Sequence, residues 1–232
     1  MGNPELSLAI PLYNEEANVA GLLGRLAKLL SANNLDYEII AVDNGSIDRT
    51  GELISEFAKR NMRVRKVVVK VNEGYGNGVL RGLHKCRGDF VGFLWGDNQI
   101  PLSIIISVFK RLKRDDLDVC KVARVSRTEG FLRRIASFFY NIGVNLLFGI
   151  DSMDMNGCPK IMKKSVFKAM DLNSKDWFLD AEIMIKAKRM NFSVGEIPVK
   201  SKDRKAGKSS VNFFTALEFA KNIFKYRFFF NK

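Results

Sequence analysis

The first half of the chain alternates between short apolar runs and amphipathic segments, and this alternation constrains the fold more than any other feature. Residues 6–11 form an apolar run that suits a buried parallel strand, and further strands are expected at 37–42, in the β-rich run 64–71 and at 89–94. Each run precedes a polar turn and then apolar residues at helical spacing. The pattern predicts an α/β fold with a mostly parallel sheet flanked by helices. Ligands bind such sheets at the carboxyl ends of the strands.

The expected helix starts follow from capping chemistry. Asn14 precedes an acidic pair that favours the first turn of a helix, so we expect it to cap the first helix. Ser46 or Asp48 is expected to cap the second helix. After residue 115 the alternation becomes irregular. The pattern there predicts a basic segment at 121–134, an apolar segment, a turn at 156–159, a helix near Asp180 and a strand at 194–199.

The composition is that of a globular, strongly basic chain. It is 47% hydrophobic, and 38 Lys+Arg against 25 Asp+Glu give a formal net charge of +13 at pH 7. No helix-turn-helix, zinc finger or RNA-binding aromatic motif accompanies this charge, so we expect no nucleic acid partner. The three cysteines lie far apart in the sequence and indicate neither a zinc site nor a disulfide framework.

Two apolar stretches, at 135–150 and 211–230, fall short of membrane-spanning helices. The first is short and interrupted by Asn and Gly, whereas the second contains charged residues and has an amphipathic pattern. Next to so many basic residues, both indicate contact with anionic lipid headgroups or with a phosphorylated acceptor. The amino-terminal residues lack the pattern of a signal peptide. We therefore expect a cytoplasmic protein that associates peripherally with the cytosolic face of a membrane.

Polar residues that follow the expected strands are candidates for a ligand site. Asp43 follows the second strand, where a carboxylate can accept hydrogen bonds from a nucleotide, although an Asx turn explains it equally simply. Asp97 and Gln99 follow the fourth strand. Their oxygen atoms suit Mg²⁺ or Mn²⁺ held against a diphosphate, and a solvated turn is the alternative.

Two further candidates lie in the second half of the chain. Asp180 begins an expected helix, where it either complements the helix dipole or acts as a general base. Arg204 opens a loop with lysine, glycine and paired serine, which is either a phosphate-binding loop or a solvated charged segment. The glycine-rich segment at 72–78 lacks GxGxxG and a Walker lysine, so we interpret it as a tight turn from strand to helix.

In this order, the motifs resemble those of the family 2 glycosyltransferases of GT-A fold. Within that family they resemble the branch of dolichyl-phosphate mannosyltransferase and the bacterial polyprenyl-phosphate sugar transferases. The matching segments are 10–16, 42–50, 72–78, 96–99, 196–199 and 204–209. The resemblance implies a Rossmann-like GT-A domain at 1–210, with a nucleotide-sugar-binding half at about 1–115 and an acceptor half at about 116–210. An amphipathic membrane-surface helix would follow at 211–232.

The resemblance also implies an activity and assigns residues to it. Such enzymes transfer a sugar from a GDP- or UDP-linked donor to a polyprenyl or dolichyl phosphate, while Mg²⁺ or Mn²⁺ neutralises the leaving diphosphate. The implied catalytic residues are Asp97 and Asp180, and the implied metal ligands are Asp97 and Gln99. The nucleotide-sugar-binding residues would be Pro11, Tyr13, Glu15, Asp43, Asn44, Gly96 and Arg204. The acceptor phosphate would meet Arg124, Arg127, Arg133 and Arg134.

One position departs from the family pattern. The family usually has Asp-X-Asp where this chain has Trp95-Gly96-Asp97, and an indole cannot ligate a metal ion. We expect the activity to be retained because Asp43, Asp180 and Arg204 are all present. Two alternatives stay open. One is a glycosyltransferase that acts on a glycan or glycolipid hydroxyl, which needs Asp180 as a base. The other is a catalytically impaired partner subunit that binds nucleotide sugar.

Overall fold

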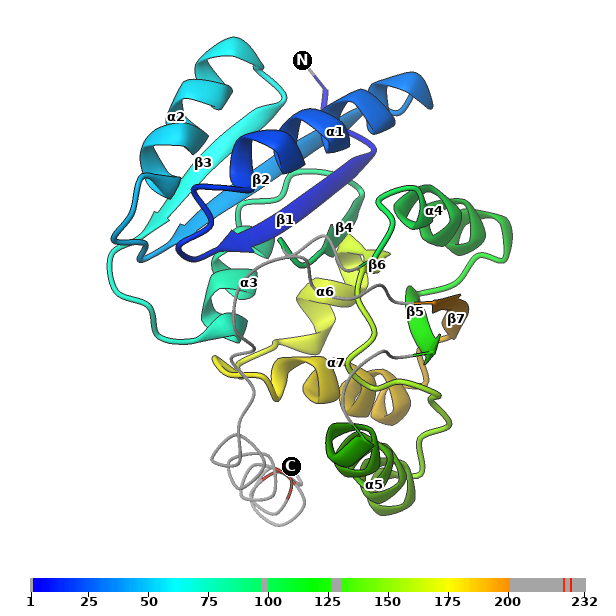
Figure 1. Ribbon diagram of the computed structural model, residues 1–232. Coiled ribbons are helices and arrows are strands. Elements are labelled where there is room, and N and C mark those ends of the chain that lie inside the picture. Colours follow the sequence, from blue (N-terminus) through cyan, green and yellow to red (C-terminus); the bar gives the residue numbers. More distant parts are fainter. Residues whose placement is uncertain (1, 97–99, 127–130, 201–222, 224–225, 227–232) are drawn as a thin grey trace.

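The computed structural model describes residues 2–96, 100–126, 131–200, 223 and 226, without the side chains at 126 and 131–139. In this part of the chain, one seven-stranded sheet has the strand order β3-β2-β1-β4-β6-β5-β7 (Figure 1). The strands are β1 (Leu6–Leu12), β2 (Tyr37–Asn44), β3 (Val64–Val69), β4 (Phe90–Phe93), β5 (Val119–Ser126), β6 (Lys160–Lys163) and β7 (Val194–Lys200). The helices are α1 (Val19–Ala32), α2 (Thr50–Arg60), α3 (Tyr75–Leu83), α4 (Ile104–Arg114), α5 (Phe131–Phe148), α6 (Lys164–Met170) and α7 (Leu179–Arg189).

The first four strands are parallel, and their order reverses between β1 and β4. Strands β2 and β3 lie on one side of β1, whereas β4 pairs with the other side of β1. Right-handed crossovers place α1 and α2 on one face of the sheet and α3 on the opposite face. In Figure 1, α1 and α2 lie side by side over the β1–β3 part of the sheet. The reversal creates a crevice at the carboxyl ends of β1 and β4, which is the usual ligand site in such sheets.

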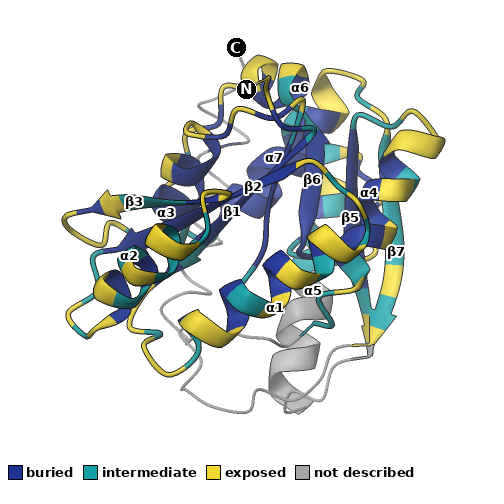
Figure 2. Ribbon diagram, turned by 90° about the horizontal axis from the view of Figure 1, so that it is seen from above, coloured by how far each residue is buried: buried dark blue, intermediate teal, exposed yellow. Residues whose placement is uncertain are grey.

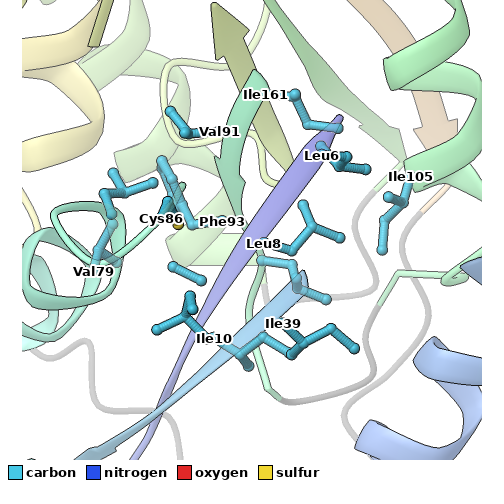
Figure 3. Close-up of a cluster of buried hydrophobic side chains, with 14 of the residues drawn as sticks. Leu6, Leu8, Ile10, Ile39, Val79, Cys86, Val91, Phe93, Ile105 and Ile161 are labelled. Atoms are coloured by element: carbon cyan, nitrogen blue, oxygen red, sulfur yellow. The ribbon is translucent and has the colours of Figure 1, made fainter. Parts of the chain in front are cut away.

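The core lies between the sheet and its helices, and the central strands β1, β2 and β4 are buried over almost their whole length. Figure 2 shows β2 and β6 dark blue inside, β3 and β7 largely teal and yellow, and the outer faces of α1 and α2 yellow. Figure 3 shows Leu6, Leu8 and Ile10 of β1 among side chains from β2, β4 and α3. All three are fully buried. The apolar runs that predicted strands are therefore the centre of the core, and the predicted α/β fold is confirmed.

The predicted cap at Asn14 is wrong. Helix α1 begins only at Val19, and its N-cap residue is Asn18. Asn14 has a left-handed backbone with φ of 53°, and its Oδ1 accepts a hydrogen bond from the Ile47 amide at 3.0 Å. The side chain that the local sequence predicts as a helix cap therefore binds the loop after β2 instead. The predicted cap of the second helix at Ser46 or Asp48 is also wrong, because the N-cap residue of α2 is Arg49. Asp48 lies one residue earlier, and its Oδ1 accepts the Thr50 amide at 2.9 Å.

The second half of the chain completes the sheet in a way that the sequence did not predict. Strand β6 is antiparallel to both β4 and β5, and β7 pairs parallel with β5. The segment at 121–134, which we expected only to be basic, instead begins inside β5, with Lys121 fully buried. A second, smaller core cluster joins α5 to α7, with members that include Val144, Phe178 and Ile185. Tyr226, beyond the continuous described segments, packs into this cluster.

Within the described residues, no helix combines the length and the apolar character needed to cross a bilayer. The predicted helix at 211–232 falls almost entirely outside the described residues, so it stays a prediction. Ile223 and Tyr226 are described, and both are helical.

Candidate active site

The carboxyl ends of β1 and β2 form one side of the crevice. Leu12 and Asp43 are partners in the parallel register, so the residues after them begin at the same edge of the sheet. Two hydrogen bonds join the loops that follow. The Glu15 amide donates to Thr50 Oγ1 at 2.8 Å, and the Asn14 amide donates to Ser46 Oγ at 3.2 Å. The structure thus brings together the segments that carry the predicted nucleotide-binding residues of β1 and β2.

Asp43 and Asn44 lie at the end of β2 and are 8% and 4% exposed. Asp43 Oδ1 accepts the Ser46 amide at 3.1 Å, and Lys66 Nζ lies 4.0 Å from its Oδ2. The Asn44 amide nitrogen donates to the Gly74 carbonyl at 3.1 Å. Among the described residues, Asn44 Oδ1 has no hydrogen-bond partner although it is buried. A buried oxygen atom without a hydrogen-bond donor is suited to accept a hydrogen bond from a polar ligand.

The other predicted donor-binding residues of β1 and β4 lie at this edge as well. Pro11 is a half-buried residue of β1, and Tyr13 just beyond it is exposed. Glu15 is half-buried, and its Oε2 accepts a hydrogen bond from the Asn18 side chain at 2.8 Å. Gly96 follows β4 and packs so closely that a Cβ atom there would lie 2.8 Å from Leu12 Cδ2. A side chain at this position would therefore require the Leu12 side chain to move.

Trp95, immediately before Gly96, is held by two neighbours. Its indole Nε1 donates to the Tyr75 hydroxyl at 3.0 Å, and the Arg124 guanidinium carbon lies 4.9 Å from its ring centroid. The Tyr75 ring in turn stacks on Trp177, with centroids 4.4 Å apart and planes 13° from parallel. Trp95 therefore takes part in an aromatic cluster at the position where the family pattern has a carboxylate.

Arg124, a predicted acceptor-phosphate residue, forms a bidentate ion pair. Its Nε and Nη2 atoms donate to the Asp154 carboxylate at 2.7 and 3.0 Å, and its backbone amide donates to Oδ2 at 3.1 Å. The two side chains are 9% and 1% exposed. The described structure therefore gives Arg124 a firm internal partner, and its contact with an acceptor phosphate stays a prediction.

Asp180, a predicted catalytic residue, is buried at the start of α7. Its Oδ1 contacts the ammonium of Lys160, and both side chains are at most 1% exposed. Lys160 also donates to the carbonyls of Met155 and Gly157 at 3.1 and 2.8 Å. This carboxylate is thus satisfied inside the protein, and its role in the reaction stays a prediction.

A second buried lysine lies beside the first. Lys121 of β5 is the register partner of Lys160 of β6. Its Nζ lies 2.7 Å from Glu196 Oε1 and donates to the Asp154 carbonyl at 2.6 Å. Burial, followed by the neighbouring Lys160 ammonium, lowers the pKa of Lys121, and Glu196 opposes that shift. The two lysines and Arg124 all bind groups of residues 154–157, which fixes this segment beside β5 and the amino end of β6.

Several predicted site residues lie outside the described residues. These are Asp97, Gln99, Arg127 and Arg204, together with the side chains of Arg133 and Arg134 on α5. The described residues contain no group of three or more histidine, cysteine or acidic side chains placed to hold a metal ion. Metal binding by Asp97 and Gln99 therefore stays a prediction.

The sequence pattern did not indicate four residues that the structure brings to this region, namely Tyr75, Asp154, Lys160 and Trp177. Tyr75 belongs to the glycine-rich segment at 72–78, for which the pattern predicts only a tight turn, and it begins helix α3. Gly74 does carry the turn, because its φ of 115° is a conformation that other residues rarely adopt. A lysine inside a short β-rich run was the one available signal for Lys160, since charged residues enter buried strands only with a partner.

Known proteins with similar sequences match most of this chain. An undecaprenyl-phosphate 4-deoxy-4-formamido-L-arabinose transferase of Edwardsiella ictaluri is 31% identical over 206 residues, which cover 88% of this chain and 62% of that protein. A dodecaprenyl-phosphate galacturonate synthase of Rhizobium johnstonii is 31% identical over 72% of this chain and 50% of its own length. A dolichyl-phosphate beta-glucosyltransferase of Dictyostelium discoideum is 25% identical, and the match covers 97% of this chain and 75% of that protein. The chain thus spans about half to three quarters of the length of these relatives.

Solved structures show the same fold. Glucosyl-3-phosphoglycerate synthase from Mycobacterium tuberculosis, in complex with Mn²⁺, UDP-glucose and phosphoglyceric acid, superposes with a TM-score of 0.75. The alignment covers 97% of this chain and 79% of that one, at 15% identity. Another crystal structure of that enzyme contains Mn²⁺ and UDP. At this identity the likeness establishes the fold, which is the GT-A fold that the sequence predicted.

The family description of glycosyl transferase family 2 matches residues 7–170. This range contains strands β2 to β6 and almost all of β1, and it includes both sides of the crevice at the β1–β4 reversal. The sheet order, the loops at its carboxyl edge and the sequence match all agree, and the chain therefore belongs to glycosyl transferase family 2.

Proposed function

We propose that this protein transfers a sugar from a nucleoside diphosphate sugar to a polyprenyl phosphate at a membrane surface. One observation carries the choice of acceptor. Asp180, the candidate base of the second half, is buried and ion-paired with Lys160. A hydroxyl acceptor needs a base that can reach it, whereas a phosphate acceptor is already ionised. The named activities of the three relatives, all of them polyprenyl- or dolichyl-phosphate enzymes, support the same choice.

In the proposed reaction, a phosphate oxygen of the lipid attacks the anomeric carbon of the sugar. A new carbon–oxygen bond forms there while the bond to the diphosphate breaks, and the nucleoside diphosphate leaves with that electron pair. Asp43 and the unpartnered Asn44 Oδ1 would accept hydrogen bonds from the nucleoside. Arg204 would bind phosphate. The protein's main contribution is then to position two anionic reactants close together.

A divalent ion, Mg²⁺ or Mn²⁺, belongs to this proposal. Asp97 and Gln99 would hold it, because carboxylate and amide oxygens are the ligands that such hard cations prefer. When bound, the ion would neutralise charge on the leaving diphosphate. The neighbouring Trp95 cannot ligate the ion, so Asp97 is the carboxylate on which this site depends.

The membrane contact is proposed for the outer side of α5, at the cytosolic face of a bilayer. Ile142, Leu146 and Leu147 are exposed there, whereas Val144 on the inner side is buried in the second core cluster. The basic carboxyl end of α7 lies beside this helix, with the Arg189 guanidinium carbon 6.0 Å from the Phe148 ring centroid. Apolar side chains bordered by basic ones suit the surface of an anionic membrane.

The test is release of nucleoside diphosphate from a panel of UDP- and GDP-sugars, with polyprenyl phosphate and Mg²⁺ or Mn²⁺. We expect turnover with one donor and its loss in Asp97→Ala. Asp89→Ala is the matched control, since Asp89 is exposed just before β4, at the opposite end of the same strand. Turnover with a glycan hydroxyl acceptor alone would contradict the proposal.

A second candidate function is a partner subunit that binds nucleotide sugar without turning it over. The observation that favours it is Trp95, whose indole donates a hydrogen bond to Tyr75 where the family pattern has a carboxylate. Nucleotide binding by calorimetry, without release of diphosphate from any donor in the panel, would support this candidate.

A further inference from the structure

Five side chains from five separate segments meet beside the carboxyl end of β4. We call them the Trp95 bracket, and they are Tyr75, Trp95, Arg124, Asp154 and Trp177. Their contacts form a continuous series. Trp177 stacks on Tyr75, Tyr75 accepts the Trp95 indole hydrogen, Trp95 lies under the Arg124 guanidinium, and Arg124 forms an ion pair with Asp154.

The bracket connects the two halves of the chain. Tyr75 and Trp95 belong to α3 and the end of β4, in the proposed donor half. Arg124, Asp154 and Trp177 belong to β5, the 152–157 segment and the turn before α7, in the proposed acceptor half. Two contacts therefore cross between the halves, namely the Tyr75–Trp177 stack and the Arg124–Trp95 pair.

Side-chain contacts hold the 152–157 segment of the proposed acceptor half. It has no regular secondary structure of more than a turn, and side chains from other elements hold its backbone. The Met153 amide donates to Glu196 Oε2 at 3.0 Å, and the Met155 amide donates to Asn141 Oδ1 at 2.8 Å. Arg124 supplies a third contact to this segment, because its guanidinium donates two hydrogen bonds to the Asp154 carboxylate.

We propose that Trp95 is a positioning residue that fixes the 152–157 segment relative to the end of β4 by acting through Arg124. The indole has two separable functions. Its N–H group fixes the ring against Tyr75, and its face holds the planar guanidinium in the orientation that suits bidentate pairing with Asp154. An aromatic residue at this position thus supplies a mechanical connection between the donor and acceptor halves where a carboxylate would supply charge.

The first test measures the connection itself by amide hydrogen exchange in the unliganded full chain. The reporters are the Met153 and Met155 amides. In Trp95→Leu, which removes both the face and the N–H group, we expect exchange at both to accelerate about fivefold, the loss expected for one cation–π contact. Trp95→Phe keeps a ring under Arg124, so it should show a smaller change.

Two controls separate this effect from a general loss of stability. Tyr37→Phe removes a buried hydroxyl that donates to the Ala27 carbonyl at 3.1 Å, far from the bracket in the sequence and at the other end of β2. It should leave both reporters unchanged. The Ile39 amide of β2, which donates to the Arg63 carbonyl at 2.8 Å, should exchange equally in wild type and Trp95→Leu. The proposal would be overturned if Trp95→Leu left the exchange rates of the Met153 and Met155 amides unchanged. It would also be overturned if the Ile39 amide exchanged faster by the same factor.

The second test concerns catalysis and rests on the proposed function. If the bracket aligns the acceptor half with the donor half, Trp95→Leu should lower kcat about tenfold and leave KM for the nucleotide sugar within about twofold, because alignment acts in the transition state. An increase in KM alone, or an unchanged kcat, would refute the positioning role. If the wild-type chain turns over no donor, the proposed function fails, and the exchange measurement still decides whether the connection exists.

Discussion

The ammonium of Lys160 contacts the carboxylate of Asp180 in the interior of the protein, where both side chains are at most 1% exposed. Lys160 comes from β6 and Asp180 from the first turn of α7, so the pair joins an interior strand of the sheet to helix α7. Removing one partner of such a pair leaves a buried charge without compensation. The pair therefore allows a structural role for Asp180 to be distinguished from a catalytic one.

The first prediction concerns this pair. Asp180→Asn should lower the free energy of unfolding by about 3–5 kcal/mol, because the Lys160 ammonium loses its buried counterion. In Lys160→Met/Asp180→Asn the loss should be smaller than the sum of the single losses, since the two sites are in contact. Urea denaturation measures all three. Asp36→Asn, at an exposed surface pair, is the control and should change little. An Asp180→Asn protein with wild-type stability and no turnover would instead indicate a catalytic base.

The second prediction concerns pH. Glu38 is buried beside β1, where it accepts hydrogen bonds from Ser7 and from the backbone and side chain of Arg87. Burial alone would raise the pKa of Glu38, but these hydrogen bonds together outweigh it and hold the pKa below its usual 4.5. A carboxyl group with a depressed folded pKa contributes stability above its unfolded pKa, and that contribution is lost as the pH falls through the folded pKa.

Glu38→Gln should therefore cost about 2 kcal/mol of unfolding free energy at pH 7. The difference from wild type should narrow as the pH falls below 4.5, which urea titrations at a series of pH values will show. Glu52→Gln is the matched control, because Glu52 forms an exposed pair with Arg49 on α2. A difference that stays constant down to pH 3 would contradict the assignment of the shift to Glu38.

The third prediction concerns the membrane-facing side of α5. Leu146 is 79% exposed, and replacing it with Glu should reduce binding to anionic phospholipid vesicles about tenfold, because an apolar contact is lost and a like charge is added. Met62→Glu is the control, since Met62 is 86% exposed after α2, and Figure 1 shows α2 and α5 at opposite ends of the molecule. Vesicle sedimentation measures both. If both variants lost vesicle binding to the same extent, the change in net charge alone would explain the effect.

The fourth prediction concerns the cysteines, all three of which are buried. Burial raises the pKa of the Cys86 thiol to about 12 and that of the Cys120 thiol to about 11. Thiolate is the reactive form, so neither should react with a disulfide reagent at pH 8 in the native protein. In urea all three thiols should react. Rapid labelling of the native chain would show that these parts of the core open readily.

The sequence by itself determined the first half of the fold. Strands β1 and β4 are apolar runs and β2 and β3 are rich in β-branched and aromatic residues, and their alternation with amphipathic helices predicts a parallel sheet covered on both faces. The ligand edge was predictable for the same reason, because parallel strands place their carboxyl ends together. Asp43, Glu15 and Gly96 therefore lie where the order of strands and turns implied.

Which polar and charged side chains pair with one another depended on the tertiary structure. Asn14 fits a helix cap locally, yet its side chain binds the Ile47 amide in the loop after β2. The sequence near Lys121 and Lys160 does not show which carboxylates pair with them, because Glu196 and Asp180 belong to distant segments. A local pattern encodes which face of an element is apolar. It does not encode which distant residue will satisfy a buried charge, because that depends on strand register and on the order of strands in the sheet.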